Sequence, residues 1–268
     1  LANKSLQGSF KAYAMSLPSE NYVSELMSSI DVEGVNAGRK YLVESVAKRF
    51  RQQLLSIYLR LNKNLPYEFS KEACAQRDLK NKALYYLMQI AGKDEIELCY
   101  NQYKNGNNMT DVITALSLLG DVNCEQRESA LDEFYTKWKH EPLVVNKWLS
   151  IHATSNIPGT LNKVKSLMSH EAFDIKNPNK VRALIGAFAY NRMQFNEPKG
   201  SGYTFLADMI IQLDPMNPQV AARLVSGLIN YKRYDRNRME LMRNELLKLS
   251  NIDKISKDVS EIVMKSLH

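Results

Sequence analysis

Two arginine–glycine pairs are the residues of this sequence whose types and spacing could do chemistry. Arg182 is followed by Gly186 in the segment NPNKVRALIGAFAYN, and Arg223 is followed by Gly227 in the segment NPQVAARLVSGLIN. Residues four apart lie on one face of an α-helix, so each glycine is expected to leave space beside the stem of its arginine. A glycine inside a helix costs about 1 kcal/mol relative to alanine, so its repetition at one offset calls for a physical reason.

The residues alone leave two interpretations of these pairs open. In the first, the glycines allow close helix–helix packing, and each arginine caps a neighbouring helix or pairs with a buried acid. In the second, each guanidinium projects into open space as a planar fork that binds a carboxylate or a phosphate. The second interpretation makes Arg182 and Arg223 the candidate binding residues of the chain.

No catalytic centre and no metal site are predicted in this chain. The zinc-protease pattern His-Glu-x-x-His fails at both of its His-Glu pairs, because its last position holds Val144 after His140 and Asp174 after His170. Glycine-rich phosphate loops, serine elbows and Cys-x-x-Cys pairs are also missing from the sequence. The 3 cysteines are therefore expected to be free, buried thiols in a reducing cytosol.

The elements that must position the two arginines are helices. Apolar residues recur at spacings of three and four, most clearly over 41–61, and strand-like alternation of useful length is absent. Asn-Pro at 177–178 and at 217–218 predicts helix starts, with an N-cap residue followed by proline at the first helical position. Gly92 and Gly120 follow apolar runs and are expected as left-handed C-caps. The sequence predicts an all-α chain.

Two features favour a stack of helical pairs over a single bundle. The sequence has only 11 Gly and 8 Pro, which indicates long helices with short connections. The two Asn-Pro helices are separated by about 40 residues, close to the period of HEAT and armadillo repeats. We predict an all-α superhelical stack of helical hairpins that forms a single domain.

The charge pattern argues against nucleic acid and membrane partners. A net charge of +7 permits an anionic partner without demanding one, because 36 basic residues are interleaved with 29 acidic ones. The basic stretch 232–248 carries an ordinary apolar stripe and no nucleic-acid motif, so we expect a solvated face. Arg236 and Arg238 fall in the first turn of a helix that Asp235 would cap, which indicates an acidic neighbour. No apolar run reaches the roughly 18 residues of a membrane span, and no signal-peptide pattern opens the sequence.

Six short segments then occur in a characteristic order and spacing. They are SLPSE (16–20), NNMTD (107–111), NPNKVRALIGAFA (177–189), GSGY (200–203), NPQVAARL (217–224) and KRYD (232–235). Together they resemble the C-terminal domain of bacterial aminopeptidase N, a family of zinc-dependent gluzincin aminopeptidases. In that family the domain is an all-helical cone that packs over the catalytic domain and closes the cavity around the active site.

The resemblance implies that residues 1–268 are a non-catalytic part of a hydrolase that removes N-terminal residues from peptides. The first residue is leucine, and we expect the chain to be a piece of a longer protein. The family's zinc ligands and its Gly-x-Met-Glu-Asn motif belong to earlier domains, so zinc would be bound by the full-length enzyme and not by this chain. There, a zinc-activated water would attack the first peptide bond with a glutamate as general base. The implied partners are the enzyme's own catalytic domain and peptide substrates, and the implied location is the cytoplasm.

The resemblance also implies a place for the two arginines. Arg182 and Arg223 would face the interior cavity and offer positive charge to the carboxylate end of a peptide. The domain would restrict the passage of peptides and shape the pocket beyond the scissile residue. The competing hypothesis is a stand-alone HEAT-like scaffold that binds an acidic protein or nucleic acid through its basic faces. Salt dependence separates the two, because a polyanion binder loses affinity steeply as salt rises.

Overall fold

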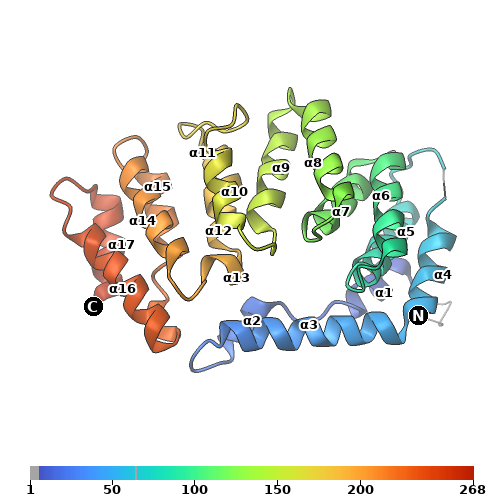
Figure 1. Ribbon diagram of the computed structural model, residues 1–268, viewed down its shortest axis with the longest axis horizontal. Helices are drawn as coiled ribbons and strands as arrows, with labels where there is room; N and C mark the ends of the chain where they lie inside the picture. Colours follow the sequence, from blue (N-terminus) through green and yellow to red (C-terminus); the bar gives the residue numbers. More distant parts are fainter. Residues whose placement is uncertain (1–5, 64) are drawn as a thin grey trace. The chain divides into compact units, whose positions relative to one another are not determined.

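The structure is a computed structural model that describes residues 6–63 and 65–268 (Figure 1). Within these ranges the chain is helical and contains no β-strand, which confirms the prediction of an all-α chain. The chain forms two compact units. Unit 1 comprises Leu1–Tyr22 and Asn36–Phe134, and unit 2 comprises Val23–Val35 and Tyr135–His268.

Unit 1 is built from helices that pack as sequential pairs. They are α1 (Gly8–Ala14), α4 (Arg51–Leu61), α5 (Lys71–Leu87), α6 (Lys93–Asn105), α7 (Met109–Gly120), and the larger parts of α3 (Val32–Arg49) and α8 (Glu125–Trp138). Helix α5 packs against α1, α4 and α7, and α6 packs against α7. The core between these helices is apolar, with Leu54, Leu84 and Leu116 fully buried. The α4–α5 and α6–α7 pairs are the helical hairpins that the sequence predicts.

The three cysteines all belong to unit 1, and all are free thiols, as predicted. Cys99 is fully buried in α6, and burial raises the pKa of its thiol well above the ordinary value. Cys74 and Cys124 are only partly buried, so the prediction of buried thiols is wrong for these two. The fully buried thiol behaves as a small apolar side chain of the core.

Unit 2 repeats the same construction with shorter pieces. Its elements are the end of α2 (Glu20–Glu25), α9 (Pro142–Thr154), α10 (Thr160–Leu167), α11 (Pro178–Val181), the π-helix η1 (Arg182–Gly186), α12 (Ala187–Ala189), α13 (Arg192–Phe195), α14 (Ser201–Leu213), α15 (Pro218–Val225), the 3₁₀-helix η2 (Tyr231–Arg233), α16 (Arg236–Ser250) and α17 (Lys257–Leu267). Helix α9 packs against α10 and η1, α14 against α15, and α16 against α17. Phe188, Phe195, Tyr203 and Phe205 meet edge to face in its core.

The predicted helix starts are confirmed, but the predicted helix ends are not. The side chains of Asn177 and Asn217 accept hydrogen bonds from backbone N–H groups of the first turns of α11 and α15. Gly120 is the last residue of α7 and has no left-handed backbone. Gly92 is the N-cap of α6, and the left-handed residue that precedes it is Ala91, with φ of 46°. The left-handed residue of the turn after α5 is therefore Ala91, one residue before the glycine that was predicted for this role.

The GSGY segment shows two separate needs for glycine. Gly200 is the N-cap of α14 and has φ of 74°, in the left-handed region where a side chain is strained. Gly202 lies in the first turn of α14, where an added Cβ would come within 2.3 Å of the Phe195 carbonyl oxygen. Both glycines are fixed by backbone geometry at the junction between α13 and α14.

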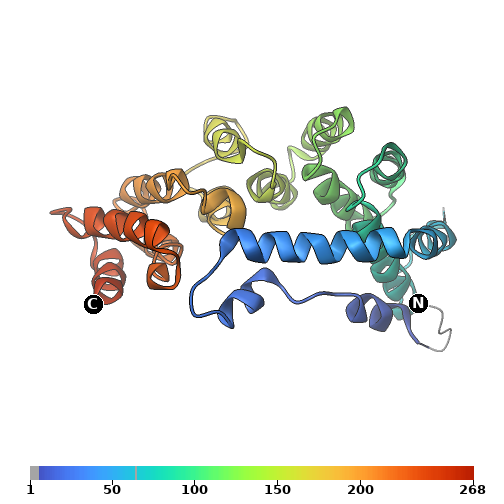
Figure 2. The ribbon, with the colours of Figure 1, turned by 60° about the horizontal axis from the view of Figure 1, so that its bottom comes forward.

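Arginines from late in the chain hold the segment Val23–Val35 within unit 2 (Figure 2). The Arg233 guanidinium donates to three backbone carbonyls at the end of α2: Ser24 at 2.8 Å, Glu25 at 3.3 Å and Met27 at 2.9 Å. Arg192 donates to the Ser24 hydroxyl at 2.6 Å. The Ser24 carbonyl also accepts from the Met27 backbone N–H at 3.2 Å. The guanidinium thus supplies a donor to carbonyls at and just after the end of α2, where the helix provides too few.

Arg238 completes this set of contacts, and we refer to Arg192, Arg233 and Arg238 as the arginine clasp. Its guanidinium pairs with Asp235 at 2.8 Å, with Glu33, and with the carbonyl oxygen of Asn196 at 2.7 Å. Asp235 also caps α16 by accepting from the Arg238 backbone N–H. The acidic neighbour predicted for the first turn of α16 is therefore present, and it comes from the other end of the chain.

The segment is also joined to unit 2 through its backbone. Ile30 and Tyr234 form an isolated parallel β-bridge, and the Ile30 N–H donates to the Arg233 carbonyl at 2.7 Å. Figure 2 shows the connection between α2 and α3 beside the start of α16, where this bridge lies. The side chain and the backbone of Arg233 thus both bind the same segment.

Candidate functional site

Arg182 opens the π-helix η1 of unit 2 and its side chain is exposed. Its guanidinium lies back along its own helix, where Nε donates to the Pro178 carbonyl at 3.2 Å and Nη2 donates to the Asn179 side-chain oxygen at 2.5 Å. A guanidinium has five N–H donors, so most of them stay available for a ligand. The π-helix is a rare conformation that occurs frequently at functional sites.

Arg223 lies in the last turn of α15 and is also exposed. Its side chain forms no hydrogen bond or ion pair with the described residues. The contacts of Arg182 and Arg223 do not match the first interpretation, because neither arginine caps a neighbouring helix or pairs with a buried acid. Both guanidinium groups can bind a carboxylate or phosphate without losing a structural ion pair.

The two glycines play different roles from each other. A Cβ at Gly186 would lie 3.9 Å from the Cβ of Arg182, so this glycine does flank the arginine stem as predicted. Gly227 lies beyond the end of α15 at Val225, so the prediction that it sits inside a helix beside Arg223 is wrong. A Cβ there would come within 2.7 Å of the Leu206 side chain, which makes Gly227 a close-packing residue. The repeated spacing therefore has two unrelated causes.

The segments that carry the two arginines are neighbours within unit 2. A Cβ at Gly186 would lie 4.0 Å from the Cδ2 atom of Leu224, the residue that follows Arg223. Leu224 is buried, and this contact joins the π-helix to α15. The structure thus places the two exposed arginines on neighbouring elements, and a side-chain atom at Gly186 would be in ordinary van der Waals contact with its surroundings.

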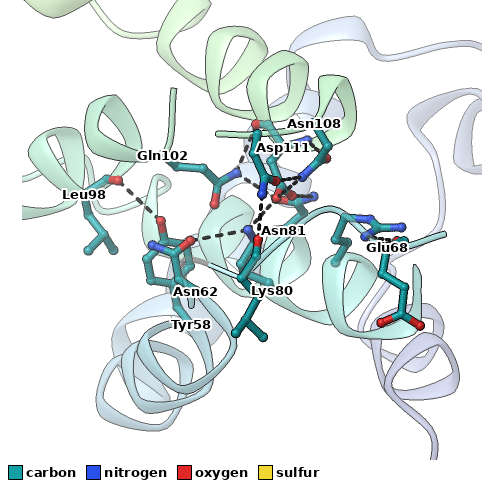
Figure 3. A network of polar contacts seen from close by, with 12 residues as sticks. Tyr58, Asn62, Glu68, Lys80, Asn81, Leu98, Gln102, Asn108 and Asp111 are labelled. Atoms are coloured by element: carbon teal, nitrogen blue, oxygen red, sulfur yellow. Dashed lines mark hydrogen bonds and ion pairs between the residues drawn. The ribbon is translucent and has the colours of Figure 1, made fainter. Parts of the chain in front are cut away.

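Sequence reasoning missed a buried polar network in unit 1 (Figure 3). Its centre is an ion pair in which the Lys80 ammonium on α5 lies 2.6 Å from the Asp111 carboxylate on α7. Their side chains are only 8% and 6% exposed. Because an isolated buried charge is very costly, both groups need partners on every side.

Amide side chains supply those partners. Asn81 donates to Asp111 at 2.9 Å, and Asn108 donates to the same carboxylate at 2.9 Å. Gln102 on α6 donates from Nε2 to the Asn81 side-chain oxygen at 2.8 Å and to the Asp111 carbonyl at 3.1 Å. These bonds fix the Gln102 amide in one orientation. Asn62, at the end of α4, accepts from Lys80 at 3.3 Å.

The network forms one wall of a pocket of about 280 Å³. The pocket is lined by polar residues and one glycine: Asn62, Lys63, Lys80, Asn101, Gln102, Asn105, Gly106, Asn107 and Asp111. The Gln102 oxygen Oε1 is buried and has no hydrogen-bond partner among the described residues. An unpaired buried acceptor costs about 1–3 kcal/mol, so a donor from outside the protein is expected at this atom.

The sequence contained an indication of this network. Asp111 belongs to the NNMTD segment. In the structure Asn108 of this segment is the N-cap of α7, and Asp111 is buried in the first turn. A lysine and an asparagine next to each other on an otherwise apolar helix face, at 80 and 81, are a second indication. Neither pattern reveals the partner across the helices.

Residues 6–63 and 65–268 contain no group of three or more His, Cys, Asp or Glu side chains that could hold a metal ion. In the same described ranges, no helix is both long enough and apolar enough to cross a membrane.

Comparison with known proteins finds similar chains among the aminopeptidases. The chain is 36% identical over 255 residues to aminopeptidase N of Haemophilus influenzae, covering 94% of this chain and 29% of the relative. It is 36% identical over 270 residues to aminopeptidase N of Escherichia coli, covering 100% of this chain and 31% of that protein. The solved structure of Legionella pneumophila aminopeptidase A in complex with aspartic acid matches with a TM-score of 0.89 and 33% identity, over 99% of this chain and 32% of that chain.

A family match extends over the whole chain. Residues 1–268 match a domain of unknown function, DUF3458_C, that is described as ARM repeats. Armadillo repeats are the class of helical stack predicted from the 40-residue offset between the Asn-Pro helices. The packing of α4 on α5, α6 on α7 and α14 on α15 agrees with that description. The chain therefore belongs to the DUF3458_C family of ARM-repeat domains.

Proposed function

We propose that residues 1–268 are the non-catalytic C-terminal domain of a zinc-dependent aminopeptidase, which removes N-terminal residues from peptides. The observation that carries the proposal is the share of each relative's length that the chain covers. The relatives and the solved structure named as aminopeptidases are covered over only 29–32% of their length, while nearly all of this chain is used. A second, larger part would then contain the reactive groups.

Zinc fits this proposal only outside the chain. The described residues offer no cluster of ligands for it, so no step of the hydrolysis is assigned to them. The metal would polarise water and the peptide carbonyl within the catalytic domain. The role left for this chain is to cover the active-site cavity and to limit which peptides pass in and out.

Exposed apolar side chains in unit 1 support a partner surface of this kind. Phe10, Tyr13, Tyr41 and Phe69 are each more than half exposed. Contiguous apolar patches on a protein surface often mark interaction sites, and these side chains would contribute to such a patch. The catalytic domain of the same polypeptide is the partner that we propose for them.

Arg182 and Arg223 would bind the C-terminal carboxylate of a peptide or of a released product. Both are exposed on adjacent elements, and neither is used up by an internal ion pair. A guanidinium binds a carboxylate through two parallel hydrogen bonds, which favours substrates that end in a free carboxylate within reach. A single amino-acid anilide has no such group.

The test is the double substitution Arg182→Ala and Arg223→Ala in the full-length protein. We expect KM for a tripeptide to rise about ten-fold or more, because charge-assisted hydrogen bonds are lost. The kinetics on an alanine anilide should stay unchanged. Arg243→Ala, at another exposed arginine of unit 2, is the matched control. Equal losses on both substrates would reject the carboxylate role.

A stand-alone scaffold that binds an acidic protein or nucleic acid is the alternative proposal, motivated by the net charge of +7. It requires a polyanion affinity that falls steeply between low and physiological salt. The aminopeptidase proposal instead requires anilide hydrolysis by the full-length protein that a zinc chelator abolishes. The cytoplasmic location stays a prediction, which cell fractionation tests.

A further inference from the structure

The polar pocket of unit 1 has a buried end with one unused acceptor and one unused donor. The acceptor is Gln102 Oε1. The NH₂ group of the same amide donates to the Asn81 side chain and the Asp111 carbonyl, which fixes the direction of the oxygen. The donor is Lys80, whose ammonium has three N–H groups and uses them toward two partners, Asp111 and Asn62. Figure 3 shows the Gln102 oxygen turned toward the side of the network where Lys80 and Asn62 meet.

We propose that this pocket binds an amide group. An amide N–H would donate to Gln102 Oε1, and the amide carbonyl oxygen would accept from the Lys80 ammonium. Both positions lie on one ligand group when that group is a primary carboxamide, whose NH₂ and C=O lie side by side. A trans peptide bond points its N–H and C=O in opposite directions and does not fit. The proposal does not rest on the proposed peptidase function, since the pocket lies in unit 1 and the two arginines lie in unit 2.

The charges of the pocket exclude the two closest ionic alternatives. A carboxylate would be attracted by Lys80 but carries no proton for the Gln102 oxygen. An ammonium group would serve the oxygen but would meet the Lys80 ammonium, a like charge that repels it. The Lys80 charge is already balanced by Asp111, so a neutral ligand preserves the network.

The pocket also has room for more than a single water molecule. Its volume of about 280 Å³ exceeds several times the roughly 30 Å³ that one water occupies in the liquid. Its outer wall carries Lys63, Asn101, Asn105 and Asn107, which are exposed and polar. A peptide can pass along this polar mouth while a primary carboxamide that it carries, on an asparagine or glutamine side chain or at an amidated end, reaches the buried end. A small free amide can reach it as well.

The first experiment measures binding of acetamide to the full-length protein by NMR titration, with acetate and methylammonium as matched probes. We expect saturable acetamide binding with a Kd on the order of millimolar, which suits a ligand of so few atoms. Acetate and methylammonium should bind at least about ten-fold more weakly. Equal binding of all three probes would overturn the proposal.

N-acetylglycinamide, a blocked peptide, separates the two sources of the amide. Tighter binding than acetamide assigns the pocket to peptides, because the second amide then contacts the mouth. Weaker binding assigns it to small free amides. A crystal of the full-length protein soaked in acetamide should show density that joins Gln102 Oε1 and Lys80 Nζ. Water alone at this position, under conditions that saturate the titration, would refute the site.

Variants test whether the amide binds in this pocket, and the first pair leaves the polar network unchanged. Asn105→Phe places a large side chain at the pocket wall, on an exposed position of α6, and should weaken acetamide binding at least ten-fold. Gln53→Phe makes the same change at an exposed position of α4 that does not line the pocket, and should leave binding unchanged. Gln102→Leu tests the acceptor directly, and Asn105→Phe stands in where that variant fails to fold. Unaltered binding in Asn105→Phe would place the amide elsewhere.

Discussion

The two units hold their polar groups together in opposite ways. In unit 1, Lys80 and Asp111 form an ion pair in which both side chains are almost completely buried and surrounded by amides. In unit 2, the buried Arg238 pairs with Glu33 and Asp235, whose side chains are 54% and 43% exposed. One unit encloses both charges, and the other encloses only the cation.

This difference determines what happens when a partner is lost. A buried carboxylate that loses its cation cannot reach water, so its desolvation is no longer offset and the folded state is strongly destabilised. A carboxylate that is half exposed regains water as soon as its arginine leaves. We expect unit 1 to be sensitive to single substitutions in the network, and the arginine clasp of unit 2 to yield gradually.

Lys80→Met should produce the largest effect. It leaves Asp111 buried with only amide donors, and we expect a loss of about 3 kcal/mol in the local stability of α5 and α7. Hydrogen exchange of the full-length protein measures this as roughly 100-fold faster exchange in these helices. Lys104→Met, which removes an exposed pair with Glu133 in the same unit, is the control and should leave exchange nearly unchanged. Similar exchange in both variants would show that burial does not set the cost.

Arg233→Met should have a smaller effect, confined to the segment Val23–Val35. Three carbonyls at and just after the end of α2 lose the Arg233 donor. Ser24 keeps the Met27 N–H and the others can bond to water, so we expect a loss of about 2 kcal/mol. The amide of Ile30, which donates to the Arg233 backbone, reports the change by hydrogen exchange. Arg236→Met, at an exposed arginine of α16, should not alter it. Release of all of unit 2 rather than this segment would contradict the local role of the clasp.

Lowering the pH should weaken the arginine clasp, and this is the smallest of the three expected effects. Partial burial raises the pKa of Asp235, but hydrogen bonds from the Arg238 side chain and backbone outweigh it, so the pKa lies below the ordinary value. A carboxyl with a lowered folded-state pKa stabilises the protein fully above the unfolded value of about 3.9, and this is lost as pH falls through the folded value. Protection of Ile30 should therefore persist at pH 5 and decline below about pH 4. In Asp235→Asn this decline should shrink, and an unchanged decline would assign it to other carboxyls.

Local patterns in the sequence predicted the fold well, because helices begin through contacts within a few residues. Asn177 and Asn217 each bind their own first turn, and Asp235 does the same for α16. The prediction of a glycine C-cap after α5 failed because the left-handed residue there is Ala91, whose β-carbon is accommodated at a strained backbone angle. No spacing rule distinguishes that alanine from its glycine neighbour.

The polar site could not be predicted for a different reason. The partners Lys80, Gln102 and Asp111 come from three helices, and only the packing of α5, α6 and α7 brings them together. In the sequence each is an ordinary polar residue on a helix. The arginines at 182 and 223 were found because their glycines repeat, although the glycine after α15 proved to serve the core.

The π-helix at Arg182–Gly186 has a consequence for the angular phase of its helix. A π-turn holds one residue more than an α-turn, and one α-helical residue corresponds to about 100° of rotation. The extra residue lets Ala183, Leu184 and Ile185 all turn inward while Arg182 stays outside. Deletion of a single residue from η1 would restore an unbroken α-helix and rotate Arg182 by about a quarter turn against the Phe188 core. The number of residues in this turn therefore sets the side of the helix from which Arg182 projects, and its hydrogen bonds to Pro178 and Asn179 then orient the guanidinium.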